Sequence, residues 1–577
     1  MPIAEQLITE HLDTWSSTIK AKSSAGRGGG KKQELYGIKK LRGLILELAV
    51  RGLLVPQDSN DKSAKNDLEL FIKNRDSSKL KITKVDDTTE AAEIDIPKSW
   101  LSVSLGEVVS IRTGFAFKSK DYADRGTFIL RVTNINADGS FDTSNSAFLA
   151  DTDLNDKMQG FQLEEGELLV VMVGGSLGKI GQVTSDILPA LLNQNMWRLK
   201  PYSVQMNLRF LRFVLYDLNE NRLQITKSTH GHLAMGTYAA AKVPFPPLAE
   251  QHRIVAKVDE LMALCDQLEQ QQTDSIAAHE TLVTALLGAL TSLSKQGQFE
   301  SAWQRIAANF DSLFTTESSI DQLKQTILQL AVMGKLVPQD PNDESVDQLL
   351  VSNDKQRNDA AESDRRASRD QQPLLSSDDR WPAPDTWRWR GLADLVLFVD
   401  YRGKTPTKIP SGVRLLTAKN VRKGIINLKP EEFLSESDYH KWMTRGFPKA
   451  GDVLFTTEAP MGNAAVIQLT EQFALAQRVI CFQSYGALDT NFLALQLLSK
   501  PFQLILSING TGMTAKGIKA SKLKKLPITI PPVTEQRSIV AKVDELMALC
   551  DALKVKLKSA QSTQLNLADT LVEKAIS

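Results

Sequence analysis

The sequence predicts an α+β protein in which two globular domains of mixed helix and strand are separated by long helices. Two exact or near-exact repeats and the sequence between them indicate this. The block IVAKVDELMALCD occurs at 254–266 and again at 539–551. The block LAV-x-G-x-LVPQD occurs at 48–58 and again at 330–340. The two copies of each block lie nearly half of the 577-residue chain apart, so the chain is predicted to be an internal duplication with a pseudo-twofold repeat.

Composition limits the class of protein. A chain of 577 residues is longer than one hydrophobic core usually organises, so several domains are expected. With 69 Lys and Arg against 68 Asp and Glu, the net charge of +1 indicates no polyanion partner, and any basic surface must be local. Three cysteines cannot form a disulfide framework. Since neither a signal peptide nor an apolar run of membrane-spanning length is recognisable, a cytoplasmic protein is expected.

The thirteen-residue repeat is predicted to be helical, because its apolar residues follow steps of four and three. This spacing forms a seam of the kind found in coiled coils. The predicted seam residues are Ile254, Val258, Leu261, Cys265 and Leu268, with Ile539, Val543, Leu546, Cys550 and Leu553 in the second copy. We expect the two seams to face each other in an antiparallel coiled coil, with both cysteines as small core residues rather than reactive thiols. Two separate amphipathic helices are the alternative.

The second repeated block is predicted to end a helix. Gly52 and Gly334 suit a C-terminal cap, and Pro56 and Pro338 follow as stop signals. Polar stretches come next, at 59–95 and 345–380, with the composition of charged helices or flexible linkers. The predicted boundaries are 1–99 for an N-terminal helical segment and linker, 100–248 for domain 1, 249–345 for a central repeated helical region, 346–386 for a polar linker, 387–530 for domain 2 and 531–577 for the C-terminal repeated helix.

Domains 1 and 2 share an order of predicted elements while their residues differ. Each begins with a tryptophan, Trp100 or Trp387, before a strand. Each then has a strand that ends in an asparagine-bearing turn, an acidic-glycine step into a second strand, and a glycine loop before a third. A nearly invariant helical frame that carries two divergent domains is suited to presenting two different recognition surfaces.

Motifs for catalysis were sought and are lacking. The segment from Gly174 to Ile180 resembles a phosphate-binding loop, but its spacing is one residue short and Ile180 replaces the Ser or Thr that would hold magnesium. No His-Glu-x-x-His or paired Cys-x-x-Cys occurs. His230 and His232 have no Cys or His cluster around them, so a contact with solvent or phosphate is favoured over metal binding. We therefore expect no catalytic residue, metal or cofactor in this chain.

Local charge indicates a polyanion partner for domain 2. It has 13 Lys and 7 Arg against 5 Asp and 5 Glu, an excess of 10 positive charges, whereas basic and acidic residues are equal in number in domain 1. Taken singly, each of the candidate residues below is more often an exposed polar side chain without a DNA contact. Recognition of bases needs only a few well-placed side chains. The candidate DNA-binding residues are Arg131, Asn134, Asn136, Lys179, Asn193, Gln194, Asn195, His230 and His232 in domain 1, and Arg402, Lys404, Lys419, Asn420, Arg422, Lys516, Lys519 and Lys522 in domain 2.

The segments PPLAEQHRIV at 246–255 and PPVTEQRSIV at 531–540 resemble the segment that closes each target-recognition domain in specificity (S) subunits of type I restriction-modification enzymes. The alternation of variable domain and helix is similar to that family over nearly the whole chain. The resemblance implies a non-catalytic subunit whose two target-recognition domains each read one half of a split site in double-stranded DNA. It also implies that the helices set the spacing and dock two modification (methyltransferase) subunits. Those partners would bring S-adenosylmethionine to methylate adenine, and restriction subunits would add ATP- and magnesium-dependent translocation and cleavage.

Two other functions remain open from the residues alone. One is a combined restriction-modification polypeptide with its own methyltransferase activity, and the other is a coiled-coil adaptor whose domains bind peptides. The first alternative would need the Asn/Asp-Pro-Pro-aromatic motif, whereas Pro-Pro occurs here only as Phe-Pro-Pro-Leu and Ile-Pro-Pro-Val. The second would need neither a pair of large domains nor their divergence.

Overall fold

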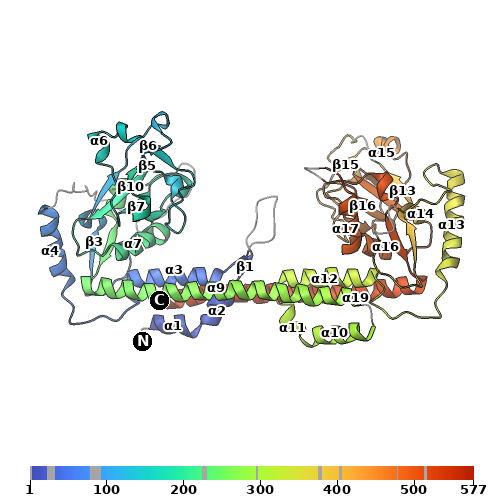
Figure 1. Cartoon of the computed structure of the whole chain (residues 1–577), viewed down its shortest axis with the longest axis horizontal. Helices are drawn as coiled ribbons and strands as arrows, with labels where there is room; N and C mark the ends of the chain where they lie inside the picture. Colours follow the sequence, from blue (N-terminus) through green and yellow to red (C-terminus); the bar gives the residue numbers. More distant parts are fainter. Residues whose placement is uncertain are drawn as a thin grey trace. The chain divides into compact units, whose positions relative to one another are not determined.

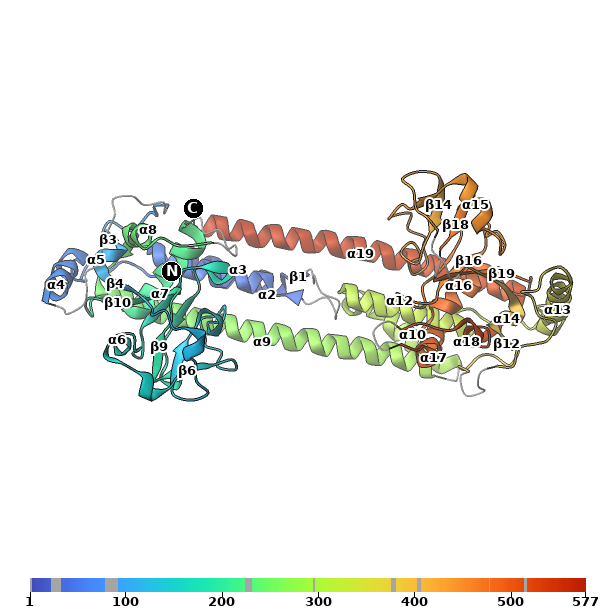
Figure 2. The ribbon, with the colours of Figure 1, turned by 90° about the horizontal axis from the view of Figure 1, so that it is seen from above.

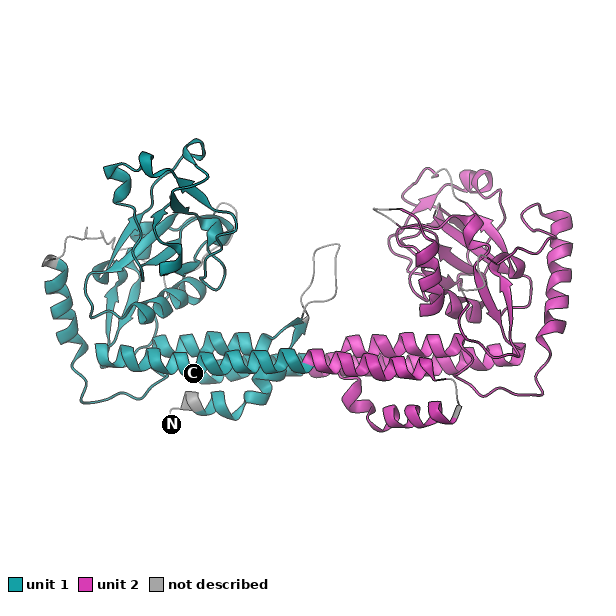
Figure 3. Ribbon diagram, in the orientation of Figure 1, with its two compact units in different colours: residues 1–275, 561–577 teal, residues 276–560 magenta. Residues whose placement is uncertain are grey.

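The computed structural model describes residues 3–21, 33–77, 92–223, 231–293, 296–374, 380–401, 406–476, 478–512 and 516–576. Helices and sheets occur together, as the predicted α+β class requires (Figure 1). The chain divides into two compact units (Figure 3). Unit 1 consists of residues 1–275 and 561–577, and unit 2 of residues 276–560. The two longest helices, α9 (Leu248–Ser292) and α19 (Val533–Ile576), each begin in one unit and end in the other.

The helical part of unit 1 combines N-terminal helices with one end of each long helix. Its own elements are α1 (Ile3–Glu10), α2 (Leu12–Ser17), the pair β1 (Lys20–Ala21) and β2 (Gln33–Glu34), α3 (Tyr36–Arg51) and α4 (Ala64–Ser77). As predicted, α3 ends at Gly52, which has a φ of 71°. A Cβ at Gly52 would lie 2.5 Å from the Pro97 side chain, so the close approach of domain 1 also requires glycine here.

Domain 1 is built on three small sheets. The antiparallel pair of β3 (Leu101–Ser104) and β11 (Lys242–Phe245) joins its two ends. The main sheet has the order β4-β10-β7-β8, from Val109–Thr113, Met196–Pro201, Leu168–Val171 and Ile180–Gln182. The second sheet has the order β6-β5-β9, from Ala147–Leu149, Thr127–Leu130 and Ala190–Leu192. The helices are α5 (Leu105–Val108), α6 (Asp156–Gln159), α7 (Leu208–Asp217), the π-helix Leu218–Arg222, α8 (Met235–Ala240) and the 3-10 turns Ser119–Asp121, Val132–Asn134, Asp151–Asp153, Gly174–Ser176 and Ser185–Ile187.

Unit 2 repeats this plan. Its helical part contains α10 (Gln296–Ala308), α11 (Phe310–Leu313), α12 (Glu317–Val332) and α13 (Val346–Ser363). In domain 2, β12 (Arg388–Gly391) pairs with β20 (Pro527–Ile530). The main sheet β13-β19-β16-β17 uses Val396–Asp400, Val479–Ser484, Val453–Thr456 and Ala464–Val466, and the second sheet β15-β14-β18 uses Phe433–Leu434, Val413–Leu416 and Phe473–Leu475. Its helices are α14 (Leu392–Leu395), α15 (Glu436–Trp442), α16 (Thr490–Leu498), α17 (Lys500–Asn509) and α18 (Ala520–Leu523). Strand order and connectivity thus match between the domains.

The predicted seam residues are buried except for Leu268, Leu546 and Leu553, which are half-buried, and the two identical stripes belong to different cores. Val258 and Cys265 of α9 pack in the core of unit 1, which includes residues of α3 and Leu571 near the end of α19. Val543 and Cys550 of α19 pack in the core of unit 2, with residues of α12 and the later part of α9. The expectation that the stripes face each other was therefore wrong. In each repeat the apolar face of a second helix, α3 in unit 1 and α12 in unit 2, packs against the stripe.

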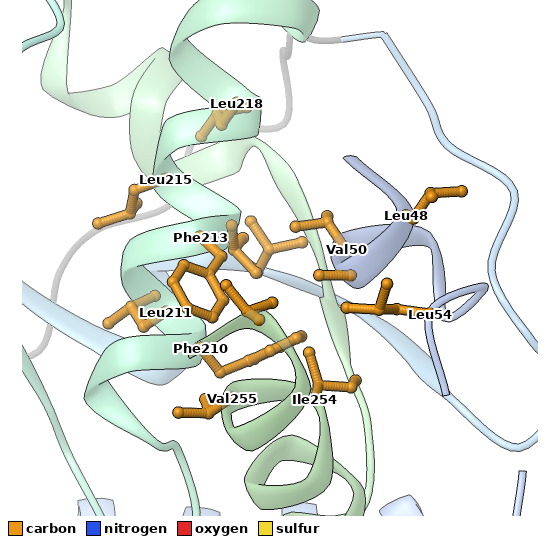
Figure 4. Packing of buried hydrophobic residues seen from close by; sticks show 14 of the residues in the cluster. Leu48, Val50, Leu54, Phe210, Leu211, Phe213, Leu215, Leu218, Ile254 and Val255 are labelled. Atoms are coloured by element: carbon orange, nitrogen blue, oxygen red, sulfur yellow. The ribbon is translucent and has the colours of Figure 1, made fainter. Parts of the chain in front are cut away.

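Figure 4 shows the core of unit 1 where α7 of domain 1 meets α9 and the end of α3, with Phe210 beside Ile254 and Val255. Figure 2 shows α3 running alongside α9 in the same unit. Both cysteines of the repeats are buried, as expected for core residues, and burial raises the pKa of the Cys265 thiol to about 11. A thiol protonated at neutral pH is a poor nucleophile.

The segment 346–386, predicted as a polar linker, contains the helix α13, which packs against domain 2. Arg357 of α13 forms a buried ion pair with Asp394, with 3.2 Å between Nη1 and Oδ1. The Asn353 amide donates to the Asp394 carbonyl oxygen at 2.9 Å. Further along, the indole N–H of Trp381 donates to the Val332 carbonyl at 2.9 Å. Of the two interpretations that the composition allowed, a charged helix or a flexible linker, the structure shows a helix over 346–363, and partner groups on domain 2 allow burial of Arg357.

Among the described residues, no single helix combines the length and apolarity needed to cross a membrane; one bent pair, α16 and α17, passes on length and composition together, with an angle of 64°. Phe492 of α16 and Phe502 of α17 are fully buried in the core of unit 2. Within the same described ranges, no group of three or more His, Cys, Asp or Glu side chains could hold a metal ion.

Candidate nucleic-acid interface

A buried hydrogen-bonded joint fastens each domain to the first turn of a long helix. The indole N–H of Trp100 donates to Glu250 of α9 at 2.9 Å, and Gln57 of the LVPQD block also donates to Glu250. Gln251 accepts from the Asn207 backbone N–H at 2.7 Å. The Glu-Gln pair and the LVPQD block recur together in the sequence because residues of the two segments hydrogen-bond to each other in this joint.

The second joint has the same parts. Trp387 donates to Glu535 of α19 at 2.9 Å, Gln339 donates to the same carboxyl group, and Gln536 accepts from the Asp489 backbone N–H at 2.7 Å. Burial raises the pKa of Glu250, and it raises the pKa of Glu535 to about 7. The orientation of each domain on its helix is therefore set by an internal polar contact rather than by the apolar core alone.

Three chain segments converge at one place in domain 1, which we name loop cluster 1: residues 172–174, Asn195 and residues 231–233. The Met172 N–H donates to the Asn195 carbonyl at 3.0 Å, and the Leu233 N–H donates to the Met172 carbonyl at 2.9 Å. The Gly174 N–H donates to the Gly231 carbonyl at 2.9 Å. Asn195 and the neighbouring predicted residues Gln194 and His232 are exposed. Loop cluster 1 therefore presents polar side chains from a hydrogen-bonded base.

Domain 2 has the same arrangement in loop cluster 2: residues 457–458, Arg478 and residues 517–518. The Thr457 N–H donates to the Arg478 carbonyl at 3.0 Å, and the Ile518 N–H donates to the Thr457 carbonyl at 3.0 Å. Lys516 and Lys519, both predicted DNA contacts, flank the third segment and are exposed. Lys522 is half-buried and points an ammonium group toward the Asn509 carbonyl at 3.5 Å. Two backbone contacts of loop cluster 1, those made by Met172, thus recur at Thr457 in loop cluster 2, whereas the side chains of the two clusters differ.

Asn134 and Asn420, both predicted to contact DNA, are buried and hydrogen-bonded inside their own domains. Each is 1% exposed. The Asn134 amide accepts from the Arg131 N–H at 3.0 Å and donates to the Asp142 carbonyl at 2.8 Å. The Asn420 amide accepts from the Thr417 N–H and donates to the Asn427 carbonyl, both at 2.9 Å. Since both ends of each amide are used inside the fold, neither is free to read a base in this conformation.

The remaining predicted residues divide by exposure. Arg131 donates to the Asn145 carbonyl at 2.6 Å, and Asn136 donates to the Ser140 hydroxyl at 3.0 Å, so both brace a loop. Asn193 is 9% exposed and accepts from the next backbone N–H. Lys419 and Arg422 are exposed on a neighbouring turn of domain 2. His230, Arg402 and Lys404 lie outside the described residues.

A cavity of about 560 Å³ lies in unit 1, where α7 and loops of domain 1 meet α3 and α9. Its charged lining includes the cations Lys39, Arg42, Lys179, Arg209 and Arg212 and the acids Asp138, Glu220 and Asp259. Lys179 donates to the Ile135 carbonyl at 3.1 Å and lines this cavity. Burial lowers the pKa of Arg212, whose guanidinium donates to the Asp138 carbonyl at 3.0 Å. Lys179 and Arg212 thus bind backbone carbonyls within domain 1, whereas Arg42 and Arg209 pair with acids of α9.

The family model for the type I restriction modification DNA specificity domain matches residues 97–278 and 434–560, more than half of the chain. The chain belongs to this family. The specificity subunit of the type I restriction enzyme EcoAI from Escherichia coli is 32% identical, over 99% of each chain. That of EcoEI, also from Escherichia coli, is 31% identical over 99% of each chain. Among solved structures, the HsdS subunit from Thermoanaerobacter tengcongensis is 16% identical, covering 85% of this chain and 99% of that one, with a TM-score of 0.42.

Sequence patterns did not single out Arg478 and Glu458 of this specificity subunit. Arg478 is 49% exposed in its side chain and forms an ion pair with Glu458, with 2.6 Å between Nε and Oε1. A signal was present, because the separation of Asn195 and Arg478 in the sequence lies between the separations of the two repeated blocks. Aligning the domains at that separation would have placed Arg478 opposite a residue already singled out.

Proposed function

We propose that this specificity subunit reads a two-part site in double-stranded DNA, one part through each loop cluster. The observation that carries the proposal is the repetition of one backbone arrangement with different side chains in domains 1 and 2. A common frame with divergent polar side chains is what two readers of unlike base sequences need, because base edges are distinguished by donors and acceptors while the backbone only positions the domain.

As a specificity subunit, the chain is the non-catalytic component of a type I restriction-modification system. We infer that two modification subunits supply S-adenosylmethionine and methylate adenine, and that restriction subunits supply the ATP- and magnesium-dependent steps. The chemistry would thus come from partner chains, and this chain would determine where on the DNA it occurs.

The spacing between the two half-sites is proposed to be set by α9 and α19, paired as an antiparallel coiled coil with a pseudo-twofold relation between the repeats. Support comes from the composition of the two cores. The core of unit 1 takes Val258 from early in α9 and Leu571 from late in α19, whereas that of unit 2 takes Leu287 from late in α9 and Val543 from early in α19. This exchange of ends supports opposite helix directions. The outer faces of the same helices are proposed to dock the modification subunits.

Mapping methylated adenines in the genome of cells that carry the complete system tests the proposal. The expected result is a motif of two short specified sequences separated by unspecified bases of fixed number. Disruption of this chain should abolish that methylation, and a copy truncated after residue 275 should not restore the two-part motif. A continuous motif, or methylation that persists without this chain, would contradict the proposal.

A further inference from the structure

Two residues hold the same unusual backbone conformation at the same place in domains 1 and 2. Among the described residues other than glycine, positive φ occurs at Asn195 (73°), Ala459 (48°) and Arg478 (72°). Asn195 immediately precedes β10, and Arg478 immediately precedes β19, the equivalent strand. The carbonyl of each accepts the hydrogen bond that anchors its loop cluster. Asn195 and Arg478 are thus equivalent positions in the two repeats.

The left-handed conformation is strained for arginine, is better tolerated by asparagine, and is free of strain for glycine. Neither position is glycine, although the backbone conformation favours glycine at both. Each domain therefore has a side chain at this position. Strained residues persist where the surrounding structure enforces them, and they concentrate at functional sites. The pairing of Asn195 with Arg478 therefore indicates that the side chains themselves are needed.

The guanidinium group of Arg478 is oriented for a planar, bidentate contact. Its Nε is held by Glu458 at 2.6 Å, and the side chains of both residues remain well exposed, at 49% and 43%. Within the described residues, the two Nη groups have no hydrogen-bond partner. An arginine fixed through Nε presents these groups as parallel donors, which match the O6 and N7 acceptors of guanine in the major groove.

The geometry points to Asn195 and Arg478 as the equivalent base-reading positions of the two domains, with Arg478 reading a guanine and Asn195 an adenine. The adenine assignment follows from the amide of asparagine, which can accept from N6 and donate to N7 of that base. This inference rests on the proposed function, since it names the bases that the two loop clusters take. The two domains would then recognise different bases because the side chain at this equivalent position differs between them.

Binding of modified DNA tests the guanine contact with the natural protein. The complex of this chain with its modification subunits is titrated with duplexes in which each guanine of the mapped site is replaced in turn by 7-deazaguanine, which lacks the N7 acceptor. One guanine is expected to be sensitive, with affinity reduced by about 5-fold or more. Arg478→Ala should abolish that sensitivity, whereas Lys441→Ala, at an exposed cation of α15 in the same domain, should retain it.

The methylated motif in cells gives a second measurement. Arg478→Ala should make one G·C position of one half-site degenerate, and Asn195→Ala should do so at one A·T position of the other. Lys441→Ala should leave both half-sites unchanged. An active Arg478→Ala complex with an unaltered motif would overturn the inference while the two-part site stands, whereas a natural complex without a two-part motif would overturn the proposed function. If Arg478→Ala fails to assemble, the titration of the natural complex with 7-deazaguanine duplexes still tests the inference. Unchanged affinity at every substituted guanine would refute the guanine contact.

Discussion

The indole nitrogen of Trp387 lies 2.9 Å from a carboxylate oxygen of Glu535, so the start of domain 2 is hydrogen-bonded to the first turn of α19. Trp100 and Glu250 repeat this contact at 2.9 Å in unit 1. Both tryptophans are buried, at 3% and 4% exposure. The strength of these two contacts determines how firmly each recognition domain is held on its helix.

Replacing Trp387 by Phe should destabilise unit 2. The phenyl ring keeps most of the apolar contact, but Glu535 loses a donor in a buried site, which costs about 1–3 kcal/mol. Urea denaturation followed by circular dichroism measures the change in the free energy of unfolding. Trp303→Phe on α10 is the matched control, because its indole N–H has no hydrogen-bond partner among the described residues. Equal losses in the two variants would show that the ring, rather than the N–H, is responsible.

The stability of unit 2 should depend on pH through Glu535. Its pKa is raised by burial from 4.5 to about 7. An acid with a raised pKa in the folded state contributes stability that is fully present below pH 4.5 and is lost as pH rises through about 7. The melting temperature of the natural chain should therefore fall by a few degrees between pH 5.5 and 8 relative to that of Glu535→Gln. Glu545→Gln, at an exposed position of α19, should leave the pH dependence as it is.

Removing Arg357 should loosen α13 from domain 2. Asp394 is 2% exposed and would be left as a buried carboxyl group without its cation, a loss of about 3–5 kcal/mol. The double variant Arg357→Met with Asp394→Leu removes both charges and should lose less. Urea denaturation of the three chains supplies the comparison. A single variant as stable as the double variant would show that this ion pair does not fasten α13.

Lengthening both long helices should change the spacing of the DNA site without changing its halves. Four residues of helical sequence inserted after Gln270 in α9, with four more after residue 560 in α19, add about 6 Å to each helix. This length corresponds to roughly two base pairs of DNA. Methylation mapping should then show a longer gap between unchanged half-sites. A stable, active variant that kept the original gap would contradict the role of these helices as a spacer.

Neutralising the lysines around loop cluster 2 should weaken DNA binding in a salt-dependent way. Changing Lys516, Lys519 and Lys522 to Gln should reduce the slope of log affinity against log salt by about 0.9 for each lysine that neutralises a phosphate. Binding of the assembled complex at several salt concentrations measures this slope. A triple variant at Lys355, Lys441 and Lys449, which are exposed elsewhere in unit 2, controls for net charge. Identical slopes in the two triple variants would place the phosphate contacts elsewhere.

Residue patterns predicted several local features correctly because short-range physics decides them. The glycines that follow the ends of α3 and α12, Gly52 and Gly334, have φ of 71° and 67°, as a left-handed helix terminus requires. Burial of Cys265 and Cys550 follows from the apolar period of the repeat. The site residues were less predictable, since an asparagine in a loop can equally turn inward, as Asn134 does, or outward, as Asn195 does.

The sequence by itself determined that the chain is duplicated, that each half combines a helical frame with a divergent domain, and which helix faces are apolar. Only the tertiary structure decided which apolar faces meet, and it placed Val258 and Val543 in separate cores. It also decided that Arg478 lies beside Glu458, with a left-handed backbone anchored by Thr457. The physical reason is that identical stripes have identical affinities for any apolar partner, so their pairing depends on which other helices and loops the folded chain brings near.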